Sequence, residues 1–204
     1  GSYRDTLGAT SQTACATCPA GSSCAASTAA PLSCAPGSYS GSGALLCTAC
    51  EAGTYQNGAG QTACISCPPG SYCEVGASAT LPCPSGRFRS IPGAGSALEC
   101  SLCPAGSACG TGSDGPAACE AGTISAEGQS MCTACAAGKL QAIAGQDSCE
   151  EAPAGSYTQD RATLAVLCSA GTFSPNAGQP SCTGCTSGKY QGMQGKSACE
   201  DCPP

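Results

Sequence analysis

The feature that most constrains this chain is a short unit that recurs twelve times. In each unit a glycine is followed, two residues later, by a position that takes every large aromatic side chain of the sequence, all six tyrosines and both phenylalanines. Successive positions of this kind lie about 17 residues apart, which is the signature of a repeat protein. The eight aromatic residues are Tyr3, Tyr39, Tyr55, Tyr72, Phe88, Tyr157, Phe173 and Tyr190.

Two glycines define the local structure expected of each unit. The first, here called the bend glycine, usually follows a cysteine by three residues, as Gly37 follows Cys34. The second, here called the turn glycine, often precedes the next cysteine by four residues, as Gly43 precedes Cys47. Because glycine readily adopts positive φ, the unit is predicted to be a short arm, a bend and a return to the next cysteine.

Stacked units of this kind predict a specific fold class. We expect small disulfide-rich repeats in an elongated rod of about twelve hairpin-like loops of ~17 residues, with little regular secondary structure and minimal helix. Each aromatic side chain is expected to stack on a neighbouring unit, and each unit to touch only the next.

Cysteine content supports this prediction and indicates a compartment. The chain has 22 cysteines in 204 residues, above the roughly 8–10% that marks a disulfide scaffold. Leu, Ile, Val and Phe together make only 18 residues, too few for an ordinary hydrophobic core. So many cysteines are stable as disulfides only outside a reducing cytosol, so we expect a secreted protein, extracellular or at the cell surface.

A longer period of 85 residues relates most cysteines to one another. It divides the chain into a first block at 1–87, a second at 88–172 and two further units at 173–204. The period fails at two positions together, because Cys67 corresponds to Ala152 and Cys73 to Thr158. Two cysteines lost at once are best explained as one lost disulfide, which suggests that Cys67 pairs with Cys73.

This pairing generalises to a sequential scheme, in which the cysteine before each bend glycine pairs with the next cysteine along the chain. An interlocked scheme, with Cys67–Cys83 and Cys73–Cys100, stays open because spacing alone does not fix connectivity. Both schemes leave only Cys15 and Cys202 unpaired. The sequential pairs are Cys18–Cys24, Cys34–Cys47, Cys50–Cys64, Cys67–Cys73, Cys83–Cys100, Cys103–Cys109, Cys119–Cys132, Cys135–Cys149, Cys168–Cys182 and Cys185–Cys199.

The motif "CxxCPxGxY…Gx3CxxC", carried by strings such as "CEAGTYQNGAGQTACISCPPGSYC" at 50–73, resembles the ephrin-receptor-like cysteine-rich repeats. These are relatives of the growth-factor-receptor, EGF-like and TNF-receptor cysteine-rich modules. The resemblance implies an extracellular, elongated, disulfide-bridged protein, as in receptor ectodomains, matrix-like proteins and large surface proteins of protists. TNF-receptor-like modules close a loop of this length on its own second cysteine, which agrees with Cys50–Cys64.

Several chemistries are excluded or disfavoured. The chain has no histidine, so it lacks a Ser-His or Cys-His nucleophile pair, and we expect no enzyme, no cofactor and no small-molecule substrate. The cysteines follow a loop pattern rather than zinc spacing, and Asp147, Glu150 and Glu151 lack EF-hand spacing, so neither zinc nor structural calcium is expected. No basic patch suits nucleic acid, and no apolar stretch is long enough to span a membrane.

Hydroxyl side chains suggest O-glycosylation, because Ser and Thr in Gly/Ala/Pro surroundings suit O-linked sugars. Seven of them directly precede the large residue, and on an extended arm neighbouring side chains point to opposite faces. If the aromatic ring points inward, these hydroxyls are predicted to point outward. The possible sites are Ser2, Ser38, Thr54, Ser71, Thr123, Ser156 and Thr172.

The two unpaired cysteines suggest how copies join. Residues 199–204 followed by 1–21 read "CEDCPPGSYRDTLGATSQTACATCPAG", a complete unit in which Cys202 would pair with Cys15. We therefore expect the partner to be the chain itself, head-to-tail or as a longer tandem chain. The predicted function is a structural component of an extracellular fibre or cell-surface filament. The alternative is the stalk or ligand-binding ectodomain of a cell-surface receptor.

Overall fold

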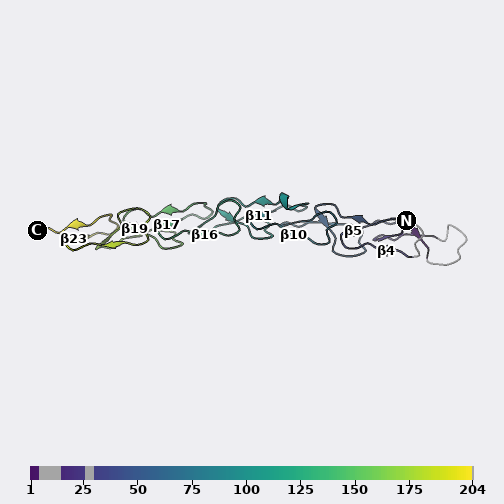
Figure 1. The fold of residues 1–204 in the computed structure, drawn as a ribbon, viewed down its shortest axis with the longest axis horizontal. Helices are drawn as coiled ribbons and strands as arrows, with labels where there is room; N and C mark the ends of the chain where they lie inside the picture. The colour runs from purple at the N-terminus through teal and green to yellow at the C-terminus, as the bar shows by residue number, and fades with distance from the viewer. Residues whose placement is uncertain (5–14, 26–29, 204) are drawn as a thin grey trace. The chain divides into compact units, whose positions relative to one another are not determined.

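The structure is a computed structural model that describes residues 1–4, 15–25 and 30–203. Contacts divide it into two units, each described by itself. Unit 1 comprises Gly1–Ser101 with Thr111–Gly115, and unit 2 comprises Leu102–Gly110 with Pro116–Pro204. Every strand in both units has two residues, and successive strands form small hairpins along the chain (Figure 1).

The two-residue strands follow one another along each unit at the spacing of the repeat. Unit 1 contains β1 (Ser2–Tyr3), β2 (Ala16–Thr17), β3 (Ser22–Ser23), β4 (Leu32–Ser33), β5 (Ser38–Tyr39), β6 (Thr48–Ala49), β7 (Thr54–Tyr55), β8 (Ile65–Ser66), β9 (Ser71–Tyr72), β10 (Leu81–Pro82), β11 (Arg87–Phe88) and the 3₁₀ turn η2 (Ala97–Glu99). Strand β12 (Ser101–Leu102) lies at the boundary. Unit 2 contains β13 (Ser107–Ala108), β14 (Ala117–Ala118), β15 (Thr123–Ile124), β16 (Thr133–Ala134), β17 (Lys139–Leu140), β18 (Glu150–Glu151), β19 (Ser156–Tyr157), β20 (Val166–Leu167), β21 (Thr172–Phe173), β22 (Thr183–Gly184), β23 (Lys189–Tyr190) and β24 (Glu200–Asp201).

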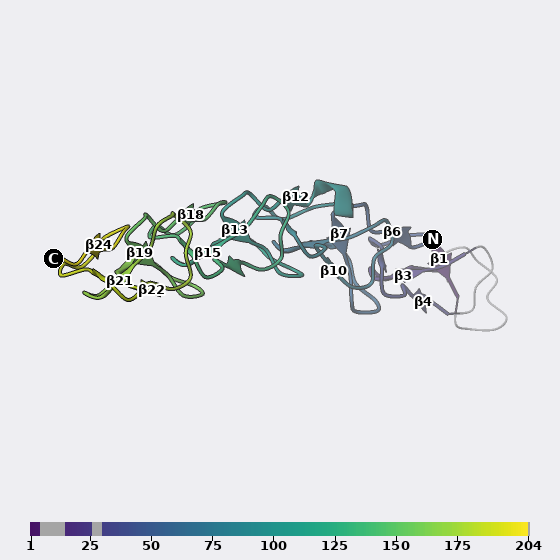
Figure 2. The same cartoon turned by 60° about the vertical axis from the view of Figure 1, so that its left-hand side comes forward.

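Each hairpin pairs the two residues after a bend glycine with the two residues that precede the next repeat's first cysteine, or Ala152 where that cysteine is absent after β18. In unit 1, β5 pairs with β6 so that Tyr39 lies opposite Thr48; in unit 2, β19 pairs with β20 in the same antiparallel register. A further bond closes the hairpin at its base, where Cys50 N donates to Gly37 O at 2.9 Å. Strands β3 and β4 of unit 1 are labelled together in Figure 2.

Successive repeats are joined by backbone hydrogen bonds that recur with the same geometry. For reference, the repeats are numbered 1 to 12 by their bend glycines. In unit 1 the bend glycine Gly37 donates to Gln56 O in the next repeat at 2.7 Å, and the next repeat's turn glycine Gly60 donates back to Cys34 O at 2.8 Å. The corresponding bonds in unit 2 run from Gly122 to Gln141 O and from Gly145 to Cys119 O. The twelve bend glycines are Gly1, Gly21, Gly37, Gly53, Gly70, Gly86, Gly106, Gly122, Gly138, Gly155, Gly171 and Gly188.

The prediction that each unit touches only the next is wrong, because bend glycines also contact the repeat after the next one. This contact tolerates no side chain. Gly37 has φ of 84°, and a Cβ placed on it would overlap the carbonyl of Gly76, the turn glycine two repeats on. In unit 2 Gly138, with φ of 87°, meets Gly178 in the same way. Glycine is therefore required twice at these positions, for its positive φ and for the close approach of two backbones.

The predicted fold class is confirmed in its main features. The described residues form small two-stranded hairpins at the predicted repeat, bridged by disulfides, and one 3₁₀ turn of three residues is the longest helical segment among them. The rod shape and the 85-residue blocks stay predictions.

A matched pair of substitutions separates the two requirements for glycine. Gly138→Ala introduces both a strained φ and an overlap with the Gly178 carbonyl, whereas Gly171→Ala introduces only the strained φ of 82°, since nothing lies within 4 Å of its Cβ. We expect Gly171→Ala to cost about 1–2 kcal/mol and Gly138→Ala about 3 kcal/mol or more, because overpacking adds to the strain.

Calorimetric melting of the oxidised, monomeric chain would measure the difference. Equal destabilisation by both substitutions would contradict the contact between repeats two apart.

Candidate functional site

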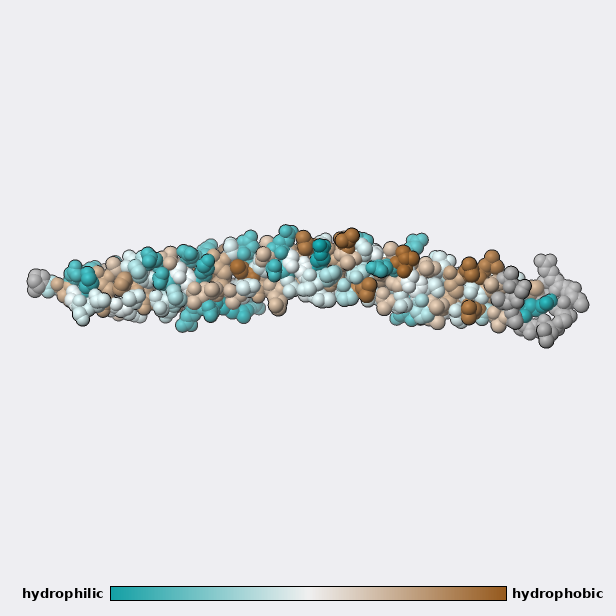
Figure 3. All heavy atoms as spheres, in the orientation of Figure 1, coloured by the Kyte–Doolittle hydropathy of each residue, from teal (hydrophilic) through white to brown (hydrophobic). Residues whose placement is uncertain are grey.

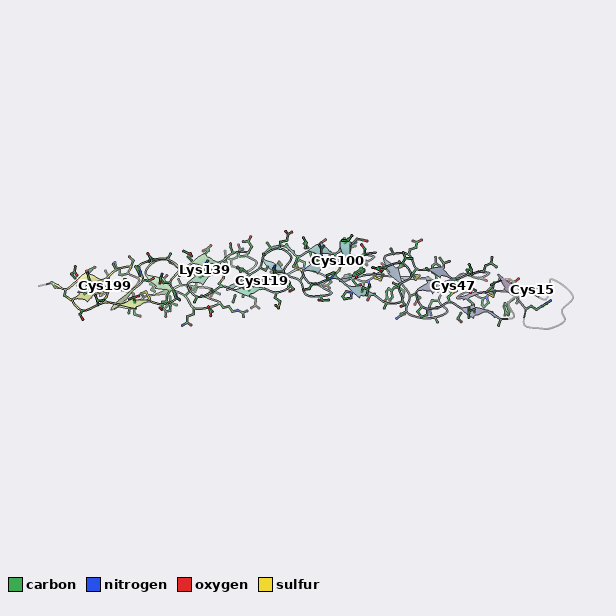
Figure 4. The ribbon with its side chains drawn as sticks, viewed as in Figure 1. Cys15, Cys47, Cys100, Cys119, Lys139 and Cys199 are labelled. Carbon is green, nitrogen blue, oxygen red and sulfur yellow. A yellow bond between two sulfur atoms is a disulfide. The ribbon has the colours of Figure 1, made fainter. Side chains whose placement is uncertain are left out.

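Ten disulfides form the interior of both units (Figure 4). Each joins a cysteine before a bend glycine to the next cysteine, which is the order of the sequential scheme rather than the interlocked one. Their Cα–Cα distances run from 5.6 Å in Cys34–Cys47 to 6.1 Å in Cys67–Cys73, inside the usual range for disulfides. The pairs are Cys18–Cys24, Cys34–Cys47, Cys50–Cys64, Cys67–Cys73, Cys83–Cys100, Cys103–Cys109, Cys119–Cys132, Cys135–Cys149, Cys168–Cys182 and Cys185–Cys199.

Cysteine sulfurs, rather than large apolar side chains, make the core. Cys18, Cys67, Cys103 and Cys168 are each fully buried, and the only fully buried hydrophobic residues besides cysteine in the described part of the chain are Ala94 and Ala152. A single repeat is too small to bury an apolar core, so each bridge supplies stability that packing cannot. A disulfide that closes a small loop contributes about 2–4 kcal/mol.

Cys15 and Cys202 carry free thiols and are both exposed. Near Cys202 the bend glycines Gly171 and Gly188 are also exposed, with nothing within 4 Å of a Cβ built on either, whereas bend glycines such as Gly138 and Gly155 are buried under a turn two repeats on. The surface that is exposed at Gly171 and Gly188 therefore corresponds to the surface that a turn covers at Gly138 and Gly155.

The aromatic side chains are half-buried in most repeats. All eight aromatic residues are partly exposed, and Tyr190 is 45% exposed. Each pairs across its hairpin with the first residue of the return strand, as Tyr55 pairs with Ile65 and Tyr157 with Val166. The stacking of each ring on a neighbouring unit stays a prediction.

The hydroxyls that precede the large residues do not all point outward, as they were predicted to do. Ser71, Thr123 and Ser156 are buried rather than pointing to solvent. Each donates to the backbone carbonyl three residues earlier, at 2.6 to 2.7 Å. The reason is local: the bend places the short hydroxyl over the preceding turn, where it satisfies a carbonyl as Ser and Thr commonly do, and a ring could not enter that space. Ser38, Thr54 and Thr172 make the same bond but are half-buried, and Ser2 is exposed.

A set of buried polar residues directly after the large side chain was missed by sequence reasoning. Gln56 is 5% exposed; its Nε2 donates to Ala63 O and its Oε1 accepts from Gly58 N. Gln141 and Gln191 bind their own loops in the same way. Glutamine at the same place in three repeats was the available signal. These side chains hold the turns that contact neighbouring repeats.

Repeat 10 keeps its fold without its disulfide. Ala152 and Thr158 stand where repeat 5 has Cys67 and Cys73, and both are buried. Thr158 Oγ1 donates to Lys139 O at 3.1 Å, while Ala152 N donates to Gly138 O at 2.9 Å and Ala152 O accepts from Gly178 N at 2.8 Å. Backbone bonds therefore preserve the position of both residues in the absence of a bridge.

Surface charges are sparse, and three ion pairs form among the described residues. Lys189 binds Asp201 at 2.7 Å, and Arg161 lies 3.3 Å from Glu120. Tyr190 O–H donates to Glu200 at 3.2 Å, and this bond, together with the carboxylate's charge, raises the pKa of Tyr190 above its usual value.

Cysteine and acidic side chains do not gather into a metal-binding group in the described residues. No three Cys, Asp or Glu side chains among residues 1–4, 15–25 and 30–203 converge on a metal site, and Asp147, Glu150 and Glu151 form no such group. Shallow surface grooves of about 240 to 400 Å³ are present, and one of about 400 Å³ in unit 2 is lined by residues that include Glu120, Thr123 and Arg161. Within the described chain no helix is long and apolar enough to cross a bilayer. Apolar side chains on the face seen in Figure 3 lie in small separate patches.

Restoring the missing bridge should stabilise the fold. The double substitution Ala152→Cys/Thr158→Cys places two cysteines at positions equivalent to Cys67 and Cys73, whose Cα atoms lie 6.1 Å apart. We expect an eleventh disulfide and a gain of about 2–3 kcal/mol, measured as a higher melting temperature under oxidising conditions. Peptide mapping after partial reduction would identify the new bridge together with the ten others. Two additional free thiols, or a Cys67–Cys83 peptide, would contradict the sequential arrangement.

Comparison with known proteins agrees with the repeat geometry and with the resemblance in the sequence. A family model described as "Tyrosine-protein kinase ephrin type A/B receptor-like" matches residues 37–80, 122–168 and 171–204, more than half of the chain. A search of curated proteins finds no match. The many disulfides and this receptor-like module both indicate an extracellular or cell-surface location. The chain belongs to the ephrin type A/B receptor-like family of disulfide-rich repeats.

Proposed function

We propose that this chain is a structural component of an extracellular fibre or cell-surface filament, extended by copies of itself. The observation that carries the proposal is the open-ended stacking of repeats. Within each unit a repeat bonds to the next through the same backbone atoms and contacts the one after it through its bend glycine. Contacts of this head-to-tail kind propagate when they do not close on themselves.

The last two repeats offer the surface on which a stack could continue. Gly171 and Gly188 hold the φ values, 82° and 84°, that earlier bend glycines use to receive a turn. Gly188 N has no backbone acceptor within the described part of unit 2, although Gly171 N bonds to Gln191 O at 2.7 Å. A second copy, or a tandem continuation, would supply the missing turn and carbonyl. Pairing of Cys202 with Cys15 of that copy would fix the junction covalently. Residues 5–14 of repeat 1 and 26–29 of repeat 2 lie outside the described residues.

The alternative function, the stalk or ligand-binding ectodomain of a receptor, is supported by the name of the matching family. Against it stands the composition of the surface, which carries few of the Trp, Tyr and Arg anchors that dominate binding hot spots. The chain has no Trp, and Tyr190 is the only tyrosine classed as exposed among residues 1–4, 15–25 and 30–203.

Electron microscopy of the oxidised chain tests the proposal. We expect filaments of uniform width, together with a peptide that links Cys202 to Cys15 of another copy. The Gly171→Ala chain should fold with a small loss of stability yet assemble at least about ten-fold less, because its Cβ would meet the incoming turn. Monodisperse short particles of the unmodified chain would overturn the fibre and favour the receptor stalk. Unimpaired assembly of Gly171→Ala would overturn the proposed junction.

We also propose that the fibre surface carries O-linked sugars on exposed hydroxyls. Of the seven hydroxyls beside the large residues, Ser2 is the exposed one. Thr48, Thr133 and Thr183, each the first residue of a return strand, are exposed in the same way, and are better placed to receive a sugar than the buried Ser71, Thr123 and Ser156.

The intact mass of material from the native source measures this modification. We expect a mass above that of the polypeptide and modified peptides containing the exposed threonines. A mass equal to the bare chain would contradict the glycan proposal.

A further inference from the structure

The basic residues differ in whether a cut beside them would separate the chain, because most of them lie inside disulfide-closed loops. A cut inside a disulfide-closed loop leaves both sides joined through the bridge, and five of the seven Lys and Arg residues lie inside such loops. These are Arg87 and Arg89 within Cys83–Cys100, Lys139 within Cys135–Cys149, and Lys189 and Lys196 within Cys185–Cys199.

Only Arg4 and Arg161 lie outside every bridge. A cut after Arg4 removes four residues, whereas a cut after Arg161 divides the chain into 1–161 and 162–204. No disulfide connects these two parts, because Cys149 closes the last bridge before the cut and Cys168 opens the first bridge after it.

Arg161 has an unusual backbone conformation. Its φ of 61° makes it the only non-glycine residue with positive φ in the described part of the chain. It occupies the turn position that Gly76 holds in repeat 5, since both donate their N–H to a cysteine carbonyl, Gly76 to Cys50 and Arg161 to Cys135. An arginine here bears strain that glycine avoids, and its side chain is 61% exposed.

The segment around Arg161 is also the longest run between bridged cysteines in residues 30–203. It extends over 150–167, because Ala152 and Thr158 replace the cysteines of repeat 5. In repeat 5, by contrast, the Cys67–Cys73 bridge leaves only residues 74–82 unclosed before Cys83. Exposed loops with small or polar residues are where proteases cut, and Leu164 beside the turn is 73% exposed.

Hydrogen bonds still hold the turn closed in the folded chain. Arg161 N donates to Cys135 O at 2.7 Å, Ala137 N donates to Asp160 Oδ1 at 2.8 Å, and Gln141 N donates to Ala162 O at 3.0 Å. A protease binds an extended segment, so these bonds must break first. The cleavage rate then follows the population of the open turn, and a missing bridge raises that population.

We propose that the Arg161–Ala162 bond is a processing site for an extracellular protease that cleaves after arginine. Hydrolysis breaks the C–N bond and consumes one water, which leaves a carboxylate on Arg161 and an amine on Ala162. The β19–β20 hairpin and its neighbours hold the two parts together afterwards, through bonds such as Cys168 N to Gly155 O. The cut leaves two parts that no disulfide joins, so they can separate without reduction of any bridge once these hydrogen bonds break. The inference does not depend on the fibre.

Limited digestion of the oxidised 204-residue chain with trypsin tests the site. On a non-reducing denaturing gel we expect a single pair of fragments, with Ala162 as the new N-terminus, before any other large fragment. Cuts at Lys139, labelled in Figure 4, should appear only after reduction. A first dividing cut elsewhere, or an uncut Arg161 after Lys139 has been cut, would overturn the proposal.

Two variants test whether the missing bridge opens the site. Ala152→Cys/Thr158→Cys keeps Arg161 and should slow its cleavage at least about ten-fold, since a disulfide of this size opposes local opening. Gly76→Arg places an arginine at the equivalent turn of a bridged repeat, and its cleavage should be at least about ten-fold slower than at Arg161. Equal rates in either comparison would overturn the role of the bridge.

Protein from the native source tests whether this cleavage occurs physiologically. Mass spectrometry of protein from the native source should detect a chain that begins at Ala162. Its absence from mature extracellular material would overturn the processing role, whatever trypsin does.

Discussion

The structure depends on the approach of one backbone to another at the bend glycine. A Cβ on Gly37 would overlap the Gly76 carbonyl, and one on Gly138 would overlap the Gly178 carbonyl. No other residue type could satisfy both this contact and a φ near +85°. Because the contact joins backbones, it is indifferent to the side chains around it. Repeats with different loops and surfaces can therefore stack with one geometry. A sequence with few large side chains can specify a defined structure in this way.

Disulfides stabilise single repeats, whereas glycines allow the contacts between repeats. The bridges are local, closing loops within single repeats such as Cys50–Cys64, and they lower the entropy that each small loop loses on folding. They do not join one repeat to the next. Association between repeats comes from hydrogen bonds such as Gly53 N to Cys73 O and from the glycine contacts. The stability of the stack is then close to a sum of local contacts between repeats one and two apart.

Sequence reasoning predicted the repeat, the hairpin and the family because these rest on spacing, and spacing survives in a single sequence. It placed the hydroxyls before the large residues in solvent, because the rule that neighbours alternate does not say which face is inside. Ser156 is instead buried and donates to the carbonyl of Pro153. The contact between repeats two apart could not be predicted, since it joins glycines through space and leaves no mark in residue type beyond the glycines themselves.

Repeat 10 shows that contacts with neighbouring repeats can maintain the structure of a repeat that lacks its disulfide. It lacks the bridge of repeat 5, and its turn holds Arg161 where Gly76 stands in repeat 5. Each change alone costs stability, yet Ala152 and Thr158 remain buried. The backbone bonds to repeats 9 and 11 and the close backbone contacts with repeats 8 and 12 have counterparts elsewhere in unit 2. In a globular core two such losses at one place would spread through the packing. In a stack of local contacts they stay local, so a single repeat can become easier to open while the repeats on both sides keep the structure that the others have.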